Sequence, residues 1–163
     1  DSKLTLFSQI ISKIDRVIFK KIVKEKKTDY RNKGFDSWTH LVSMLFCHFA
    51  KSTSVRDISN GLRSATGNLN HLGIKTAPSK SSISYQNGKR DADLFKDLYF
   101  KLLEQLGQHT KERRTKLKIK VPVYLLDSTL ISLCLSLFDW ATYRTKKGAV
   151  KMHTLLEYDG KLP

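Results

Sequence analysis

Residues 121–129 read Val-Pro-Val-Tyr-Leu-Leu-Asp-Ser-Thr, an apolar run that Pro122 opens and Asp127 ends. The Val, Tyr and Leu content and the lack of helical spacing predict a buried or half-buried β-strand. An ionised carboxylate in such a strand needs a partner, because burial removes its water. A divalent metal ion with oxygen ligands would be one such partner. The alternative is an Asx-turn, in which Asp127 caps the strand by bonding the backbone of residues 128–129.

Two further motifs follow this acid. After Leu126-Asp-Ser-Thr129 the chain reads Trp140-Ala-Thr-Tyr-Arg144 and then Gly148-Ala-Val-Lys-Met-His-Thr154. In order and spacing these three motifs resemble the start of the catalytic domain of bacterial DDE transposases of the insertion-sequence-four family. The resemblance covers roughly the last forty residues strongly. The first 120 residues resemble the amino-terminal DNA-binding region of that family through weaker motifs.

The resemblance implies a ribonuclease-H-like fold, two Mg²⁺ (or Mn²⁺) ions, and cutting and joining of the DNA ends of a mobile element. It makes Asp127 the first catalytic, metal-binding acid. The family also needs a second Asp on a later strand and a Glu on a late helix, and neither has a counterpart before Pro163. We therefore expect a fragment that binds no metal and is inactive alone.

The positive charge lies almost entirely in the front of the chain. Residues 1–120 hold 25 Lys and Arg against 11 Asp and Glu, whereas residues 121–163 hold 5 against 4. This distribution favours phosphate contacts by the front part, which steer nucleic acid without specifying sequence.

An RNA-binding structural protein is a further class of function to consider. It is disfavoured because the chain lacks an RNA-binding motif and a clear aromatic platform.

Apolar side chains at three- and four-residue steps predict one amphipathic helix over residues 4–23. Residues 24–34 are polar and aperiodic, which indicates a solvated linker. Further helices are expected after caps at Asp36 or Ser37, at residues 52–54 and at Ser79, with a turn-rich connection over residues 67–73. Another helix is expected where Asp91 and Asp93 favour an amino end through the helix macrodipole. His40 is expected on a helix surface or with its hydrogen bonds satisfied.

Residues 79–90 place one apolar side chain, Ile83, among hydroxyls, amides and cations. Such a surface suits a helix in a DNA groove, where Ser and Lys reach phosphates and Gln, Asn and Arg read base edges. With the helix before it, this element is predicted to form a helix-turn-helix-like pair with a long connection. A polar surface helix or loop is the alternative, because Gly88 and four serines weaken a helix. The predicted DNA-binding residues here are Lys80, Ser81, Ser82, Tyr85, Gln86, Lys89 and Arg90.

Residues 111–120 contain six cations and one acid, which indicates a basic linker between two domains. Its Lys111, Arg113 and Arg114 are predicted phosphate contacts. Residues 149–158 alternate between two faces and predict a strand that turns at Asp159-Gly160. Lys151 and His153 share one face of that strand. They are expected either near Asp127 and the DNA strand that is cut, or as an ordinary exposed Lys and His, and the sequence leaves both open.

These patterns predict an α+β chain in three parts. Residues 1–110 form a helical DNA-binding domain, residues 111–120 a basic linker, and residues 121–163 the opening strands of an incomplete ribonuclease-H-like α/β domain. The expected function is binding of double-stranded DNA at the ends of an insertion sequence, as part of a transposase. The alternative is a stand-alone DNA-binding protein or regulator without catalysis.

The remaining expectations concern the setting of the protein. The chain has no run of about 18 apolar residues and no secretory signal, so neither a membrane partner nor export is expected. Two distant cysteines without metal spacing agree with a reducing bacterial cytoplasm. The first helix either docks on the catalytic domain or forms a homodimer, and the sequence leaves both open.

Overall fold

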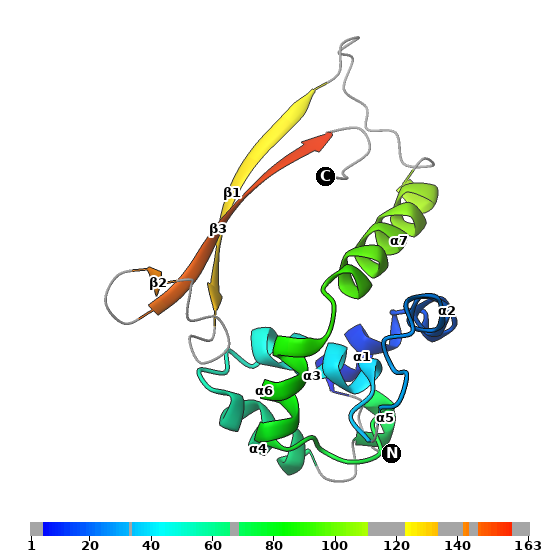
Figure 1. Cartoon of the computed structure of the whole chain (residues 1–163). Coiled ribbons are helices and arrows are strands. Elements are labelled where there is room, and N and C mark those ends of the chain that lie inside the picture. Colours follow the sequence, from blue (N-terminus) through cyan, green and yellow to red (C-terminus); the bar gives the residue numbers. More distant parts are fainter. Residues whose placement is uncertain are drawn as a thin grey trace.

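The computed structural model describes residues 5–32, 34–65, 69–110, 123–133, 142–143 and 147–157. Over these residues the chain is α+β, with helices first and strands after them (Figure 1). The helices are α1 (Leu6–Ser12), α2 (Arg16–Lys26), α3 (Ser37–Phe49), α4 (Val55–Ser64), α5 (Leu69–Leu72), α6 (Lys80–Lys89) and α7 (Asp93–Thr110). The strands are β1 (Tyr124–Leu133), β2 (Thr142–Tyr143) and β3 (Lys147–Glu157).

The first predicted helix is in fact two helices, α1 and α2. Asp15 caps the start of α2, because its carboxylate accepts hydrogen bonds from the backbone N–H groups of Val17 at 2.7 Å and Ile18 at 3.2 Å. A side chain that satisfies these free donors stabilises a new helix start at this point. The apolar period continues across the break, which is why the prediction of one helix over residues 4–23 is wrong.

The other helix starts agree with their predicted caps. Asp36 caps α3 by accepting from Thr39 N at 2.8 Å, and Ser79 caps α6 by accepting from Ser82 N at 3.1 Å. Ser54 and Asp57 form a reciprocal capping box at α4. The connection over residues 67–73 contains the short helix α5, which was not predicted.

One apolar core holds the helical part together. Helices α3, α4 and α6 contact one another, and α2 contacts α7. The fully buried side chains of this core include Val42, Ile58, Leu62, Ile83 and Leu94. Ile83 is therefore the inward-facing residue of α6, as predicted, and the polar side chains of α6 are left on its other faces.

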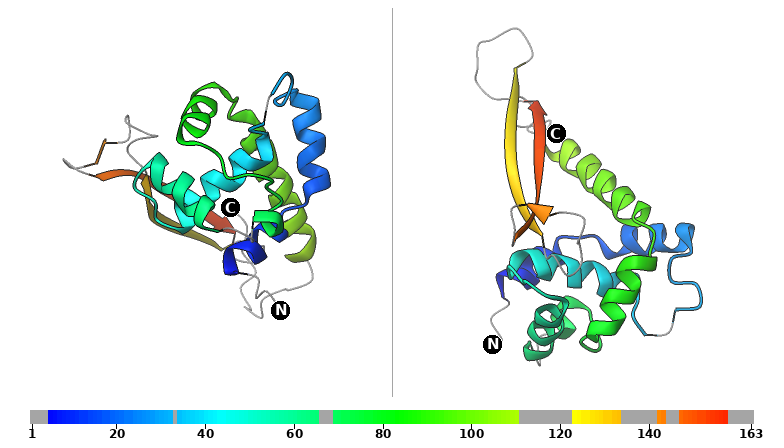
Figure 2. Two further views of the ribbon diagram at one scale, coloured as in Figure 1. Left: turned by 90° about the horizontal axis from the view of Figure 1, so that it is seen from below. Right: turned by 60° about the vertical axis from the view of Figure 1, so that its left-hand side comes forward.

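The strands form an antiparallel sheet in the order β1-β3-β2. Strand β1 pairs with β3 from Tyr124 opposite Glu157 to Leu133 opposite Gly148, and Figures 1 and 2 show this pair as a long ribbon. The strand continues six residues beyond Asp127, so the prediction that it ends there is wrong. The turn predicted at Asp159-Gly160 lies outside the described residues.

His40 lies inside the core rather than on a helix surface, which corrects the prediction. Its side chain is 1% exposed and packs between the rings of Phe35 and Phe95, with centroid distances of 5.5 and 5.4 Å. Neither ring nitrogen has a partner at ordinary hydrogen-bonding geometry among the described residues. Burial, assisted by the positive charge of Arg90, lowers the pKa of His40 to about 4, and a weak polar contact with Asn87 opposes the shift.

This burial makes stability depend on pH. The pKa of His40 in the fold lies below its ordinary unfolded value, so its contribution is complete above pH 6.5 and is lost as the pH falls toward 4. The expected loss in the free energy of unfolding over this window is about 3 kcal/mol. Urea titrations at about pH 7.5 and about pH 4 measure the free energy of unfolding of the unmodified chain and of His40→Leu. The variant lacks the titrating group and should not show this loss.

His48→Leu is the matched control, because His48 is exposed on the same helix. It should retain the pH dependence that His40→Leu loses. If the free energy of unfolding fell equally between the two pH values in His40→Leu and in the unmodified chain, the pH dependence could not be assigned to His40.

Candidate nucleic-acid interface

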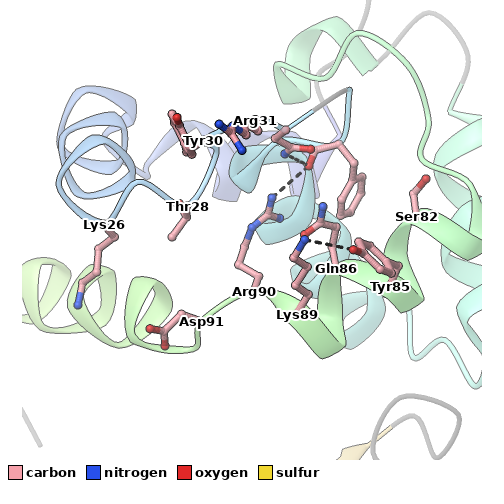
Figure 3. Close-up of a pocket in the computed structure, with 12 residues that line it drawn as sticks. Lys26, Thr28, Tyr30, Arg31, Ser82, Tyr85, Gln86, Lys89, Arg90 and Asp91 are labelled. Carbon is pink, nitrogen blue, oxygen red and sulfur yellow. Dashed lines mark hydrogen bonds between the residues drawn. The ribbon is translucent and has the colours of Figure 1, made fainter.

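A concave surface lies between α6 and the loop that joins α2 to α3 (Figure 3). Its volume is about 510 Å³, and we call it the basic groove. It is lined by Lys26, Thr28, Tyr30, Arg31, Asn32, Phe35, Ser82, Tyr85, Gln86, Lys89, Arg90 and Asp91. Five of these twelve residues, from Ser82 to Arg90, were predicted as DNA-binding residues from the polar surface of residues 79–90. Another five, from Lys26 to Asn32, come from the segment that was expected to form a solvated linker.

Arg90 holds the two halves of the groove together. Its Nη2 lies 3.2 Å from Asp29 Oδ1 and 3.1 Å from the Phe35 carbonyl oxygen, and its Nη1 lies 3.4 Å from the carbonyl oxygen of Asp36. The side chain is 1% exposed, and its Nε has no hydrogen-bond partner within the described part of the chain. The prediction that Arg90 reads a base edge is therefore corrected, because its terminal donors bind the protein itself.

Asp29 organises the loop from the other side of this ion pair. Its carboxylate accepts hydrogen bonds from Ser37 N at 2.8 Å, Ser37 Oγ at 2.8 Å and Asn32 Nδ2 at 3.3 Å. Asn32 Nδ2 also donates to the carbonyl oxygen of Phe35. These bonds fold the segment after α2 onto the start of α3, so the expectation of a solvated linker over residues 24–34 is wrong.

Two exposed tyrosines stand on the two sides of the groove, each with its own cation. The Tyr30 side chain is 72% exposed, and the Arg31 guanidinium lies 5.2 Å from its ring centroid. The Tyr85 side chain is 62% exposed, and Lys89 Nζ lies 5.3 Å from its ring and 3.1 Å from its hydroxyl. These are cation–π distances. Arg31 has a φ of 57°, a left-handed conformation that is uncommon outside glycine and often marks a functional position.

The charges of the groove differ in how they are balanced. Lys26 Nζ lies 2.9 Å from an Asp97 carboxylate oxygen on α7, which raises the pKa of Lys26, and Arg90 is paired with Asp29. Arg31 and Lys89 contact aromatic rings and form no ion pair with a described residue. The one carboxylate that lines the groove, Asp91, accepts a hydrogen bond from the backbone N–H of Asp93 at the start of α7.

A second, smaller hollow of about 380 Å³ lies at the other end of α6. Lys80 and Ser84 line it together with Arg56 from α4. Ser81 and Ser82 turn toward the cap of α6, with their hydroxyls 3.0 and 2.9 Å from Ser79 Oγ. Of the predicted residues of α6, Lys80 thus lines this hollow and Ser81 lines neither hollow, whereas the others line the basic groove.

The predicted catalytic acid lies in an open setting. Asp127 is exposed, and Thr129 Oγ1 donates to its Oδ2 at 2.8 Å. The register places Thr154 opposite Asp127, and the alternation of β3 then puts Lys151 and His153 on the opposite face of the sheet. The alternation predicted for residues 149–158, in which Lys151 and His153 share a face that Thr154 does not, agrees with this register. The expectation that Lys151 and His153 lie near Asp127 is wrong.

The implied metal ions do not fit the donor atoms found here. No described side chain on the Asp127 face of the β1–β3 pair carries a second carboxylate. Among the residues that the structure describes, no group of three or more His, Cys, Asp or Glu side chains could hold a metal ion. A two-metal centre needs several carboxylates, so Asp127 with one hydroxyl neighbour does not form one. Lys111, Arg113 and Arg114 lie outside the described residues.

Comparison with known proteins finds a family match over part of the chain. Residues 2–75 match the model of a family described as a domain of unknown function, DUF4372. No curated protein and no solved structure matches the chain. The matched segment includes Tyr30 and Arg31 but ends before α6, so the basic groove joins residues inside the match to residues beyond it. Within the described helices, none is long and apolar enough to span a bilayer.

The Asp29–Arg90 pair can be tested by a double-mutant cycle. Asp29→Asn keeps the size of the side chain but leaves the buried guanidinium without a counter-charge, and we expect a loss of about 3 kcal/mol in the free energy of unfolding. Arg90→Met removes that buried charge, so it should recover part of the loss when added to Asp29→Asn. Urea unfolding of all four proteins measures the coupling. Strictly additive losses would contradict a direct interaction.

Proposed function

We propose that this chain binds double-stranded DNA at the ends of an insertion sequence, as the DNA-binding portion of a transposase that resembles the insertion-sequence-four family. The observation that carries the proposal is the basic groove, where Arg31 and Lys89 lack a carboxylate partner among the described residues and remain available to an anion. The excess of Lys and Arg over residues 1–120 supplies the longer-range attraction. The three motifs from Leu126 to Thr154 support the assignment to a transposase.

The two hollows along α6 support a position of this helix across a DNA groove. Lys80 and Lys89 are nine residues apart, which is about 14 Å along a helix axis. The major groove of B-form DNA is about 12 Å wide. Nine residues are also about two and a half turns, so Lys80 and Lys89 lie on opposite flanks of α6. One cation on each flank is therefore placed to meet a phosphate of either strand while the exposed face between them approaches the bases.

The packing of α4 against α6 supports a helix-turn-helix-like arrangement. Ile58 and Leu62 of α4 and Ile83 of α6 belong to the same core, and Ser59 Oγ donates to the Pro78 carbonyl oxygen at 2.8 Å. This contact fixes the start of α6 on α4. The connection over residues 65–79 is longer than the three or four residues of a standard motif, so we propose a variant of it.

A second candidate is a DNA-binding protein or regulator without catalysis. It is favoured by the exposed position of Asp127 and by the lack of a second carboxylate on its face of the described strands. Both candidates use the same groove and differ only in whether Asp127 takes part in DNA cleavage.

Lys89→Ala tests the groove. Loss of one phosphate contact should weaken binding to every duplex and reduce the slope of log K against log [salt] by about 0.9. Fluorescence anisotropy between about 50 and 200 mM salt measures this slope. Lys13→Ala removes the same charge from the end of α1 and should leave the slope unchanged. Equal effects of the two substitutions, or no DNA binding at low salt, would contradict the proposal.

Asp127→Asn separates the two candidates. In the 163-residue chain it should leave duplex affinity unchanged, and neither form should nick DNA with Mg²⁺ or Mn²⁺, because the described residues give Asp127 no second carboxylate with which to hold two ions. In a full-length parent enzyme the same substitution should abolish cleavage of end-bearing DNA while binding survives. Cleavage by the parent that persists in Asp127→Asn would remove this residue from the mechanism.

A further inference from the structure

We infer that the basic groove holds an unpaired nucleotide of the bound DNA, with its base stacked on Tyr85 and its phosphates held by Arg31 and Lys89. The inference rests on the proposed DNA binding and assigns a substrate class to the same groove. It concerns the local state of the DNA, since a paired base inside a duplex offers no free face to a tyrosine ring.

The first argument is the shape of the groove. A closed duplex is contacted by side chains that project into it, whereas a base that has left the stack needs a concavity. The volume of about 510 Å³ lies within the range of pockets that enclose small organic ligands. The walls come from two segments that are distant in sequence, and the Asp29–Arg90 pair fixes their separation.

The second argument is the chemistry of the walls. Aromatic rings bind bases through their faces, and nearby cations bind the backbone, which is the combination used for single-stranded DNA. Tyr85 with Lys89 provides this combination on α6, and Tyr30 with Arg31 provides it on the loop (Figure 3). Both rings are more than half exposed, although burial of such rings is ordinarily favourable.

The third argument is the position of Gln86. It is the residue after Tyr85, it lines the same groove, and its side chain is half-buried. An amide offers one acceptor and two donors, which suits the hydrogen-bonding edge of an unpaired base. Asn32 lines the groove as well, but its Nδ2 is engaged by Asp29 and Phe35. Gln86 is therefore the amide we assign to the base edge.

The test compares three DNA probes with the unmodified chain: a fully paired duplex, the same duplex with one unpaired thymine, and a single strand. Anisotropy at low salt should show that the unpaired thymine raises duplex affinity about tenfold, the effect of one stacked base. Tyr85→Leu should remove this advantage, so that the duplexes with and without the unpaired thymine bind with equal affinity. Tyr85→Phe should keep the advantage, because it retains the ring and loses only the hydroxyl contact to Lys89.

Tyr99→Leu is the matched control, an exposed tyrosine on α7 that does not line the groove. It should behave as the unmodified chain. A 2-aminopurine at the unpaired position adds a direct readout, since stacking on Tyr85 quenches its emission and Tyr85→Leu should restore it. Tyr30→Leu tests the contribution of the loop with the same probes. It should lower the affinity gained from the unpaired thymine, although α6 is unaltered.

The outcomes separate this inference from the proposed function. Equal affinity for paired and unpaired duplexes, with no effect of Tyr85→Leu, overturns the unpaired-nucleotide site and leaves duplex binding in place. No binding of any probe at low salt overturns both. Tighter binding of a single-stranded RNA of the same sequence than of the DNA strand overturns the assignment to DNA.

Discussion

The ion pair between Asp29 and Arg90 is the interaction on which the arrangement of the functional surface depends. It joins residues that are 61 positions apart and ties the loop after α2 to the end of α6. Without it the loop would keep its local bonds to Ser37 and Asn32 and the bonds from Arg90 to the carbonyl oxygens of Phe35 and Asp36. The part of the loop around Asp29, which carries Tyr30 and Arg31, would lose its direct link to Arg90 at the end of α6. The basic groove is therefore a tertiary feature, although each of its walls is a short local segment.

The same pair also constrains the core behind the groove. Burial of a guanidinium is unfavourable unless its charge and its N–H donors have partners. Here one carboxylate and two carbonyl oxygens accept hydrogen bonds from Arg90. Burial lowers the pKa of Arg90 while Asp29 and Asp36 oppose the shift, and an arginine remains charged under these conditions. Its positive charge then acts on His40 and favours the neutral imidazole. The helical core and the groove are thus electrostatically coupled through one residue.

The features that could be predicted from the sequence are those that local contacts determine. The caps at Asp36, Ser54 and Ser79 bond to backbone groups three residues away, and Ile83 faces the core because it is the only large apolar residue of its helix. The break at Asp15 was missed because the apolar period runs through it. The strand was predicted to end at Asp127 because Asp is disfavoured inside strands, whereas the β-branched Thr129 and Ile131 continue it.

The roles that were missed depend on distant partners. Nothing near Arg90 in the sequence shows that Asp29 receives its guanidinium, so an exposed, base-reading cation was the natural prediction. The loop carried one usable signal, the Asp-Tyr-Arg-Asn sequence over residues 29–32, whose acid and amide are typical of a structured turn. The relation of Lys151 and His153 to Asp127 depends on strand register, which the period of either strand alone does not give.

Under the proposed function, the basic groove is the surface expected at DNA because it combines two cations that form no ion pair with a described residue and two exposed tyrosine rings. Lys26 and Lys101 already lie beside carboxylates of Asp97 and Glu104, so a phosphate that approached them would compete with an existing partner. Arg31 and Lys89 rest on tyrosine rings, contacts that leave their charges uncompensated and accessible. A phosphate gains the full attraction of such cations and releases its own counterions. Under the proposed function, the net charge would bring DNA to the protein, and these two positions on either side of the groove would determine where a strand is held.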